Sequence, residues 1–304
     1  MDFEILGAVA AVIGIGAAFL KWPKLSLFGT KSEKVEKDIP EADEELLESF
    51  EPPPENHSND VADRLQQLLV MLRTKHEALT VPELANWLGF DDANPLENIL
   101  NRIGSPEFAL LDEIATKLGV SPNWLKFGLS EPFSVRLPRA YDPRGYINLI
   151  KKEQPKEVFL IRSSCKTGYA SIVFRYDKFR YLVSPSGIHV SDKVGGTGTR
   201  QLWEFYRFIE ILRDDFNHGD KLDVHISGRT LDEEDYLSLV RGEVYPGLVL
   251  GKQYFECHWW DDLTDIYHEH AIAEGGYLVY GEPFVAAQAT IRSYIEFLKS
   301  RETP

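Results

Sequence analysis

The stretch from Leu79 to Gly128 constrains the fold of this chain most strongly, because it carries several helix start and stop signals at close spacing. Thr80 and Glu83 have the spacing of a capping box, which marks the start of a helix. Apolar residues recur at helical spacing in three segments of this stretch: 81–88, 94–103 and 108–118. The first and last segments end in Leu-Gly, a frequent helix C-terminus. The pattern predicts two helices around a short one, which is the order of a helix-turn-helix in an all-α domain.

Two further helices complete the predicted domain, which spans residues 60–130. Residues 60–75 have apolar side chains at helical spacing, and Ser121-Pro122 starts a short helix before Gly128. Ile103 and Phe108 belong to the apolar stripes that we expect to be buried.

The same stretch resembles the XRE or Cro-repressor family, which has a lambda-repressor-type helix-turn-helix. Three parts carry the resemblance, within about residues 60–128: Leu79-Thr-x-x-Glu-Leu-Ala-x-x-Leu-Gly89, the helix Phe108 to Gly119, and Val120-Ser-Pro-x-Trp-Leu-x-x-Gly128. The resemblance implies that the third helix lies in the major groove of DNA. It also implies a prokaryotic transcriptional regulator whose second domain senses a ligand or dimerises.

The resemblance places a set of polar residues at the DNA. The candidates for DNA contact are Thr80, Asn94, Glu97, Asn98, Asn101 and Arg102. Asn side chains can pair with adenine edges and Arg with guanine, while Glu can accept a hydrogen bond from cytosine.

Charge opposes DNA binding by this domain. Val81 stands where the family often has Gln, and Asp91 and Asp92 precede the third helix, where they would face phosphates. Between Ser58 and Leu129 six Lys and Arg residues face ten Asp and Glu residues, a difference of −4, and the whole chain carries −15. Because phosphate neutralisation dominates DNA affinity, this balance predicts weak, salt-sensitive binding. The alternative is a helix-turn-helix fold that binds a protein instead of DNA.

Residues 1–24 have the composition of a membrane anchor. The run from Ile5 to Leu20 contains only apolar and glycine residues, and with its neighbours it has about the 20 residues that a bilayer span needs. Trp22 suits the membrane interface, and lysines follow the run, which predicts a cytoplasmic position for the rest of the chain. A cleaved signal peptide would need a basic start, but Asp2 and Glu4 are acidic. We therefore expect a single-pass protein of the inner (cytoplasmic) membrane.

Residues 25–59 form a second segment of distinct composition, rich in Glu and Asp and containing the run Pro52-Pro53-Pro54. Few apolar residues are present to offset the entropy of ordering. We expect an extended linker that holds the following domains away from the membrane.

Residues 140–304 are predicted to form an α+β domain of unknown role. β-branched and aromatic residues predict strands at 158–162, 170–176, 179–184, 188–190 and 221–227. Helical periodicity and caps predict helices at 199–217, 230–242 and 282–298. The run Gly195-Gly-Thr-Gly198 lacks the spacing of a phosphate-binding loop and is expected to be a flexible turn.

The densest group of reactive side chains lies between Cys257 and His270. Imidazole and carboxylate groups are ligands for zinc or iron, which makes weak metal candidates of four residues: His258, Asp262, His268 and His270. No HExxH motif and no Ser/His/Asp arrangement is present in the sequence. The two cysteines, Cys165 and Cys257, lie far apart, which favours reduced thiols. We expect no enzyme activity, no cofactor and no dedicated metal site.

Together these patterns predict a multi-domain fold class: an N-terminal transmembrane helix, an all-α helix-turn-helix domain and an α+β C-terminal domain. The leading functional hypothesis is a membrane-tethered, DNA-binding transcriptional regulator. The alternative is a membrane-associated interaction or scaffold protein whose helix-turn-helix does not bind DNA. The expected partners are the membrane, DNA bound weakly, and a second copy or another protein.

Overall fold

The computed structural model of the chain describes residues 57–138, 143–185, 188–218, 224–252, 258–267 and 276–302. All described residues belong to one compact unit. The membrane anchor predicted from Ile5, Leu20 and Trp22 lies outside the described residues, as does the linker up to residue 56. The expected location at the cytoplasmic membrane rests on these residues and stays a prediction.

Five helices form the N-terminal part of the described chain: α1 (His57–Arg73), α2 (Val81–Leu88), α3 (Asn94–Leu100), α4 (Phe108–Leu118) and α5 (Pro122–Phe127). They lie close to the ranges predicted for them, because each helix has its own start or stop signal. The capping box of α2 is present: Thr80 Oγ1 accepts a hydrogen bond from Glu83 N, and Glu83 Oε2 accepts one from Thr80 N. Gly89 and Gly119 end α2 and α4 in the left-handed conformation. We call α1 to α5 the five-helix unit.

The rest of the described chain is built around a mixed sheet. Its strands are β1 (Glu157–Ser163), β2 (Tyr169–Arg175), β3 (Tyr181–Val183), β4 (Ile188–His189) and β5 (His225–Leu231). The order is β3-β2-β1-β5, with β4 also paired to β2. β1, β2 and β3 run antiparallel, whereas β5 is parallel to β1. A parallel neighbour needs a crossover, and α7 (Gly196–His218) is the helix between β3 and β5.

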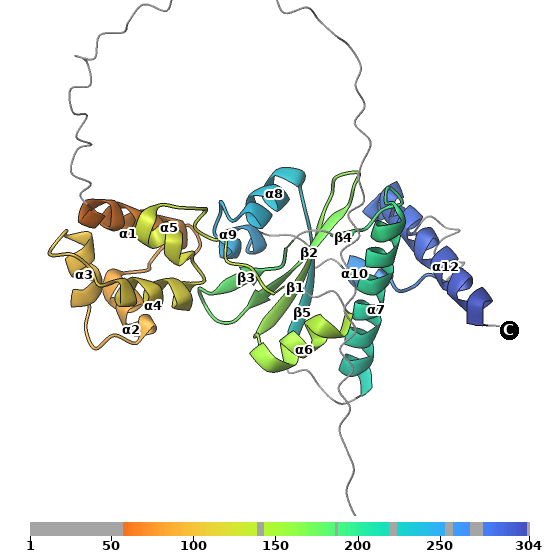
Figure 1. Cartoon of the computed structure of the whole chain (residues 1–304), viewed down its shortest axis with the longest axis horizontal. Helices are drawn as coiled ribbons and strands as arrows, with labels where there is room; N and C mark the ends of the chain where they lie inside the picture. Colours follow the sequence, from red (N-terminus) through yellow and green to blue (C-terminus); the bar gives the residue numbers. More distant parts are fainter. Residues whose placement is uncertain are drawn as a thin grey trace, which may run out of the picture. The chain divides into compact units, whose positions relative to one another are not determined.

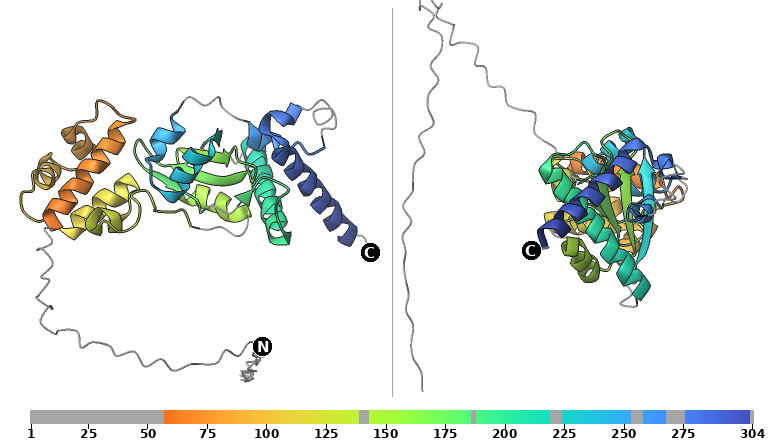
Figure 2. Two further views of the ribbon diagram at one scale, coloured as in Figure 1. Left: turned by 90° about the horizontal axis from the view of Figure 1, so that it is seen from above. Right: turned by 90° about the vertical axis from the view of Figure 1, so that its right-hand side faces the viewer.

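Helices cover both faces of the sheet (Figure 1, Figure 2). Val158 and Leu160 of β1 belong to a core shared with α6 (Pro143–Glu153), α7 and α12 (Glu282–Glu302). Phe159 and Ile161, on the opposite face of the same strand, belong to a core shared with α8 (Glu233–Arg241) and α9 (Pro246–Leu250). Two short elements complete the described chain: α10 (Trp259–Asp262) and η2 (Gly276–Tyr280). Every residue of β1 is buried, as expected for a central strand covered on both sides.

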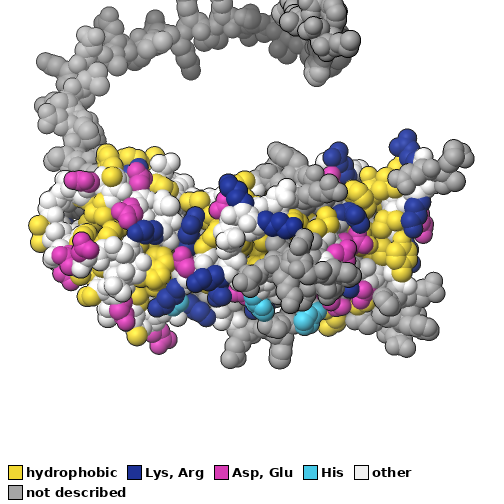
Figure 3. All heavy atoms as spheres, turned by 90° about the horizontal axis from the view of Figure 1, so that it is seen from below, with side chains coloured by type: hydrophobic (Ala, Val, Ile, Leu, Met, Phe, Trp, Pro, Cys, Tyr) yellow, Lys and Arg dark blue, Asp and Glu magenta, His cyan; other side chains and the backbone are white. Residues whose placement is uncertain are grey.

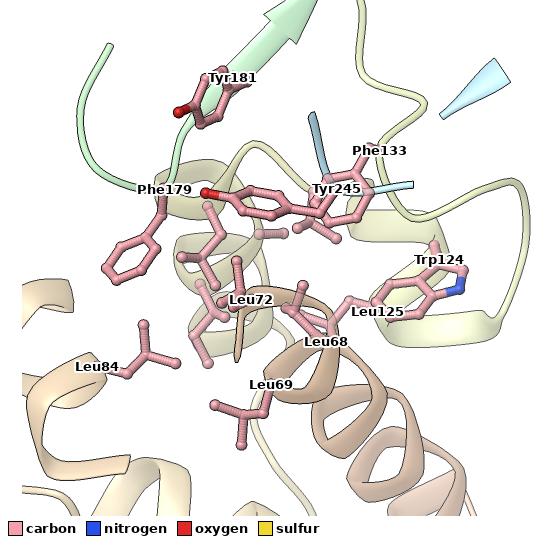
Figure 4. Close-up of a cluster of buried hydrophobic side chains, with 14 of the residues drawn as sticks. Leu68, Leu69, Leu72, Leu84, Trp124, Leu125, Phe133, Phe179, Tyr181 and Tyr245 are labelled. Atoms are coloured by element: carbon pink, nitrogen blue, oxygen red, sulfur yellow. The ribbon is translucent and has the colours of Figure 1, made fainter. Parts of the chain in front are cut away.

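The five-helix unit and the sheet share one hydrophobic core (Figure 4). Leu68 and Leu72 of α1 lie in the same buried cluster as Phe179, Tyr181 and Tyr245. Phe179 comes from the connection between β2 and β3 and is only 1% exposed. The sheet therefore contributes side chains to the interior of the five-helix unit.

The fold class predicted from the sequence is wrong. Within the described ranges no helix is long and apolar enough to cross a membrane. The C-terminal part is an α/β fold with a mixed sheet, not a separate α+β domain, and its core continues into the five-helix unit. The physical reason is that β5 pairs with β1 between residues 68 positions apart, such as Glu157 and His225, and such a pairing cannot be detected from local periodicity.

The start of α8 also differs from its prediction. The predicted helix 230–242 begins later in the structure, because Thr230 still belongs to β5, where it is paired with Arg162. Asp232 is the N-cap instead, and its side chain accepts a hydrogen bond from Asp235 N at 2.8 Å.

Candidate interaction surface of the five-helix unit

Four of the six residues predicted to contact DNA lie on α3 or at its C-cap and are exposed, whereas Thr80 caps α2 and Arg102 follows α3. Asn94, Glu97, Asn98 and Asn101 have the i, i+3, i+4, i+7 spacing of one helix face. Leu96 and Ile99 occupy the buried face, and α3 lies at the end of the five-helix unit that is remote from the sheet (Figure 1). The structure thus brings these four residues together on one accessible face.

Arg102, the predicted guanine contact, forms a salt bridge within the chain. It follows α3 with a φ of 59°, in the left-handed region. Its Nη2 forms a salt bridge of 2.7 Å with Asp63 Oδ1 of α1. The Arg102 charge is therefore paired with a carboxylate of the chain.

Four of the five other Lys and Arg residues of the five-helix unit also bind groups of the chain itself. Arg64 donates to the carbonyls of Leu125 and Lys126, and Arg73 to that of Leu79. Two salt bridges of 2.7 Å hold the remaining two: Lys117–Glu113 and Lys126–Asp112. Figure 3 shows acidic side chains spread over the face of the five-helix unit, while Lys and Arg side chains gather toward its border with the sheet.

Carboxylates of the chain occupy the N-termini of α2 and α3, the two helices of the predicted helix-turn-helix. At α2, Glu83 Oε2 accepts from both the backbone N and the hydroxyl of Thr80, at 2.9 and 3.1 Å. These hydrogen bonds lower the pKa of Glu83 from its ordinary value, so the carboxylate is charged. At α3, Asp92 Oδ1 accepts from Asn94 N at 2.8 Å. Helix N-termini are natural phosphate sites, but here each already holds an anion.

An exposed aromatic pair lies where α4 begins and α5 ends. Phe108 and Phe127 are 52% and 48% exposed, and their ring centroids are 5.7 Å apart in a T-shaped arrangement. Lys126 Nζ lies 5.7 Å from both ring centroids, and Leu129, which follows α5, is 61% exposed. We call Phe108, Phe127 and Leu129 the α4–α5 patch. Its nearest charged neighbours in sequence include three carboxylates: Glu107, Asp112 and Glu131.

Sequence patterns did not reveal the α4–α5 patch. Phe108 was predicted to be buried because it continues the apolar stripe of α4, but it is the first residue of the helix and lies beyond the core. Ile103 was also predicted to be buried and is 62% exposed, because α3 ends at Leu100. The available signal was the position of each residue at or beyond the end of its helix.

Two of the four metal candidates, His258 and Asp262, lie within the described residues. Among the residues described here, no three His, Cys, Asp or Glu side chains gather as metal ligands. His258 is exposed before α10, and the Asp262 carboxylate accepts a hydrogen bond from the Tyr280 hydroxyl at 2.5 Å. Burial, followed by the charges of Asp265 and Asp261, raises the pKa of Asp262. His268 and His270 lie outside the described residues.

No family model matches the chain, and no curated protein or solved structure matches it. The resemblance to the XRE family therefore stays a prediction that rests on the sequence.

Proposed function

We propose that this chain is an interaction protein whose five-helix unit binds another protein and does not read DNA. The observation that carries the proposal is that Asp92 occupies the N-terminus of α3, the helix that the resemblance places in the major groove. A groove-binding domain directs such an N-terminus at a phosphate, and here the phosphate would meet a carboxylate. The paired Lys and Arg residues support the same conclusion, since few of them can neutralise phosphates without breaking an internal contact.

The α4–α5 patch indicates the chemistry of the protein partner. Exposed aromatic side chains in contact are typical anchors of protein interfaces. The charged residues next to the patch in sequence are mostly acidic: Glu107 precedes Phe108, Glu131 follows Leu129 by two residues, and Asp112 forms a salt bridge with Lys126. A complementary partner presents a large apolar side chain with Lys or Arg beside it. We therefore assign the patch to a basic, apolar segment of another protein.

DNA binding by the full-length chain tests the first half of the proposal. Fluorescence anisotropy with labelled duplex fragments at about 50 mM and about 200 mM salt covers the range in which phosphate contacts lose affinity. We expect no binding at either salt concentration. Binding at low salt that is lost in Asn98→Ala but kept in Asn148→Ala, a control on α6, contradicts the proposal and favours the DNA-regulator hypothesis.

Site-directed photocross-linking in cells tests the second half. A photoreactive residue at position 108 should give a discrete adduct, and the adduct should disappear when Leu129→Asp is added to the same chain. The matched control carries the photoreactive residue at position 98, on the α3 face. An adduct at position 98 and none at position 108 contradicts the assignment of the α4–α5 patch.

A further inference from the structure

Three carboxylates lie close together on α10 and in the three residues that follow it: Asp261, Asp262 and Asp265. We call these three residues the α10 acidic group. A neighbouring cation compensates part of their charge, because Arg213 of α7 forms salt bridges of 2.9 Å with Asp261 and 3.7 Å with Asp265. Three carboxylates thus face one guanidinium, and the group attracts further positive charge.

Two tyrosines of η2 donate hydrogen bonds to the α10 acidic group. The hydroxyl of Tyr280 lies 2.5 Å from Asp262 Oδ2, and that of Tyr277 lies 3.2 Å from Asp265 Oδ2. Burial, followed by the charges of Asp265 and Asp262, raises the pKa of Tyr277 to about 12, so its hydroxyl keeps its proton. Both donors are neutral, so they orient the carboxylates without compensating their charge.

Gln288 of α12 provides an independent observation at the same place. Its side chain is only 1% exposed, and its Nε2 donates a hydrogen bond of 2.8 Å to the backbone carbonyl of Asp262. This bond fixes the orientation of the amide and leaves its Oε1 beside the α10 acidic group. Oε1 is buried and has no hydrogen-bond partner among the residues that the structure describes. Buried acceptors are normally paired, so this place lacks a donor as well as positive charge.

The group that would complete this place is a cation that donates hydrogen bonds. The side chains do not suit a metal ion, because within the described ranges no three His, Cys, Asp or Glu residues gather as metal ligands. An ammonium group has three N–H donors and can therefore bind acceptors that do not converge on one point. Tyrosine rings beside the carboxylates also favour an ammonium group. We propose that the α10 acidic group and Gln288 bind a primary ammonium group.

The environment of Asp262 supports a cationic ligand. Burial raises the pKa of Asp262, a hydrogen bond from Tyr280 opposes this shift, and the charges of Asp265 and Asp261 add to it. The raised pKa means that the charged carboxylate is disfavoured where it lies, and a cation beside it would remove this penalty. The side chains of Asp261 and Asp265 are 43% and 31% exposed, so a ligand can approach them from solvent.

Ammonium binding goes beyond partner binding at the α4–α5 patch, because it uses a different surface of the chain. Two sources supply a primary ammonium group: a small polyamine and a lysine side chain of another protein. Isothermal titration calorimetry of the full-length chain tests both, with spermidine as one probe and an N-terminally blocked peptide with a single lysine as the other. Binding of spermidine alone assigns the site to a polyamine, and binding of the peptide alone assigns it to a protein. Binding of neither probe overturns the proposal, as does equal binding of the peptide after acetylation of its lysine, which removes the charge.

Three variants locate the site in the same titrations. Asp265→Asn removes a charge from a partly exposed position, and Gln288→Met removes the amide oxygen while keeping a similar side-chain length. Each should weaken binding of the probe by about tenfold, because each removes an acceptor of a charged donor. The matched control Glu131→Gln removes an exposed carboxylate beside the α4–α5 patch and should keep the wild-type affinity. Wild-type affinity in Asp265→Asn overturns the proposal, and a loss in Glu131→Gln alone would place the ammonium group at the α4–α5 patch instead.

Discussion

The rings of Phe179 and Trp87 meet in a T-shaped contact with their centroids 4.8 Å apart. Trp87 belongs to α2, whereas Phe179 belongs to the connection between β2 and β3, so this contact joins the five-helix unit to the sheet. Phe179 also makes a T-shaped contact of 4.9 Å with His76, which follows α1. Because both parts lose core contacts when they separate, we expect them to unfold in one transition.

Replacing Phe179 tests this coupling. Phe179→Ala should lower the free energy of unfolding by about 3–5 kcal/mol, because the side chain is fully buried and leaves a cavity. Urea unfolding followed by tryptophan fluorescence and by far-UV circular dichroism measures the change. The control Phe127→Ala alters an exposed ring and should change stability by less than about 0.5 kcal/mol. Separate transitions of the two signals in the wild type would contradict the shared core.

The helices of the five-helix unit could be predicted because their signals are local. Thr80 with Glu83, Ser121 and the Leu-Gly ends each act within one or two turns of the chain, and the structure places helix ends at these residues. The shared core could not be predicted in this way. Phe179 lies about 90 residues from Trp87 in the sequence, and its alternation with neighbouring residues indicates only a strand.

The exposure of the residues on α3 could be predicted from local sequence, but the salt bridges of this surface could not. The exposed face of α3 follows from periodicity, and Asn94, Glu97, Asn98 and Asn101 are exposed as expected. Which charged side chains of this surface form salt bridges depends on partners that are distant in sequence. Arg102 was expected to be available for DNA, but its partner Asp63 lies 39 residues away on another helix.

Thr80, a candidate for DNA contact, is also the N-cap of α2, and this position predicts an effect on stability. Thr80→Ala removes the side-chain oxygen that accepts from Glu83 N, so the free energy of unfolding should fall by about 1 kcal/mol. Thr80→Ser keeps the oxygen and should stay close to the wild type. Thermal or urea unfolding of the three chains provides the comparison. Equal stability of the Ala and Ser variants would show that the cap contributes nothing measurable.

Gly242 is predicted to be the least replaceable of the helix-ending glycines. Its φ is 86°, and a Cβ there would lie 2.5 Å from the carbonyl carbon and oxygen of Phe133. Gly242→Ala therefore combines a left-handed penalty of about 1–2 kcal/mol with overpacking of about 1–3 kcal/mol. Gly104, with a φ of 70° and open space around its Cβ position, is the matched control and should show only the first cost. Similar unfolding free energies for the two Ala variants would contradict the close approach of Gly242 to Phe133.

The environment of His76 predicts that stability falls in mild acid. Burial lowers the pKa of His76 below its ordinary value of 6.5, and the positive charges of Lys178 and Lys75 lower it further. Its Nε2 lies 3.5 Å from the hydroxyl of Tyr245, inside the contact between the five-helix unit and the sheet. Because the unfolded chain takes up the proton more readily, the stability is fully present above about pH 6.5 and is lost as the pH falls toward the folded-state pKa.

A comparison of two variants isolates this effect from the carboxylates, which also titrate in acid. Urea unfolding at about pH 7.5 and about pH 5.5 gives the loss of stability for the wild type and for His76→Gln. We expect the wild type to lose more than the variant, because Gln takes up no proton over this range. An identical loss in the wild type and in His76→Gln would mean that protonation of His76 does not oppose folding.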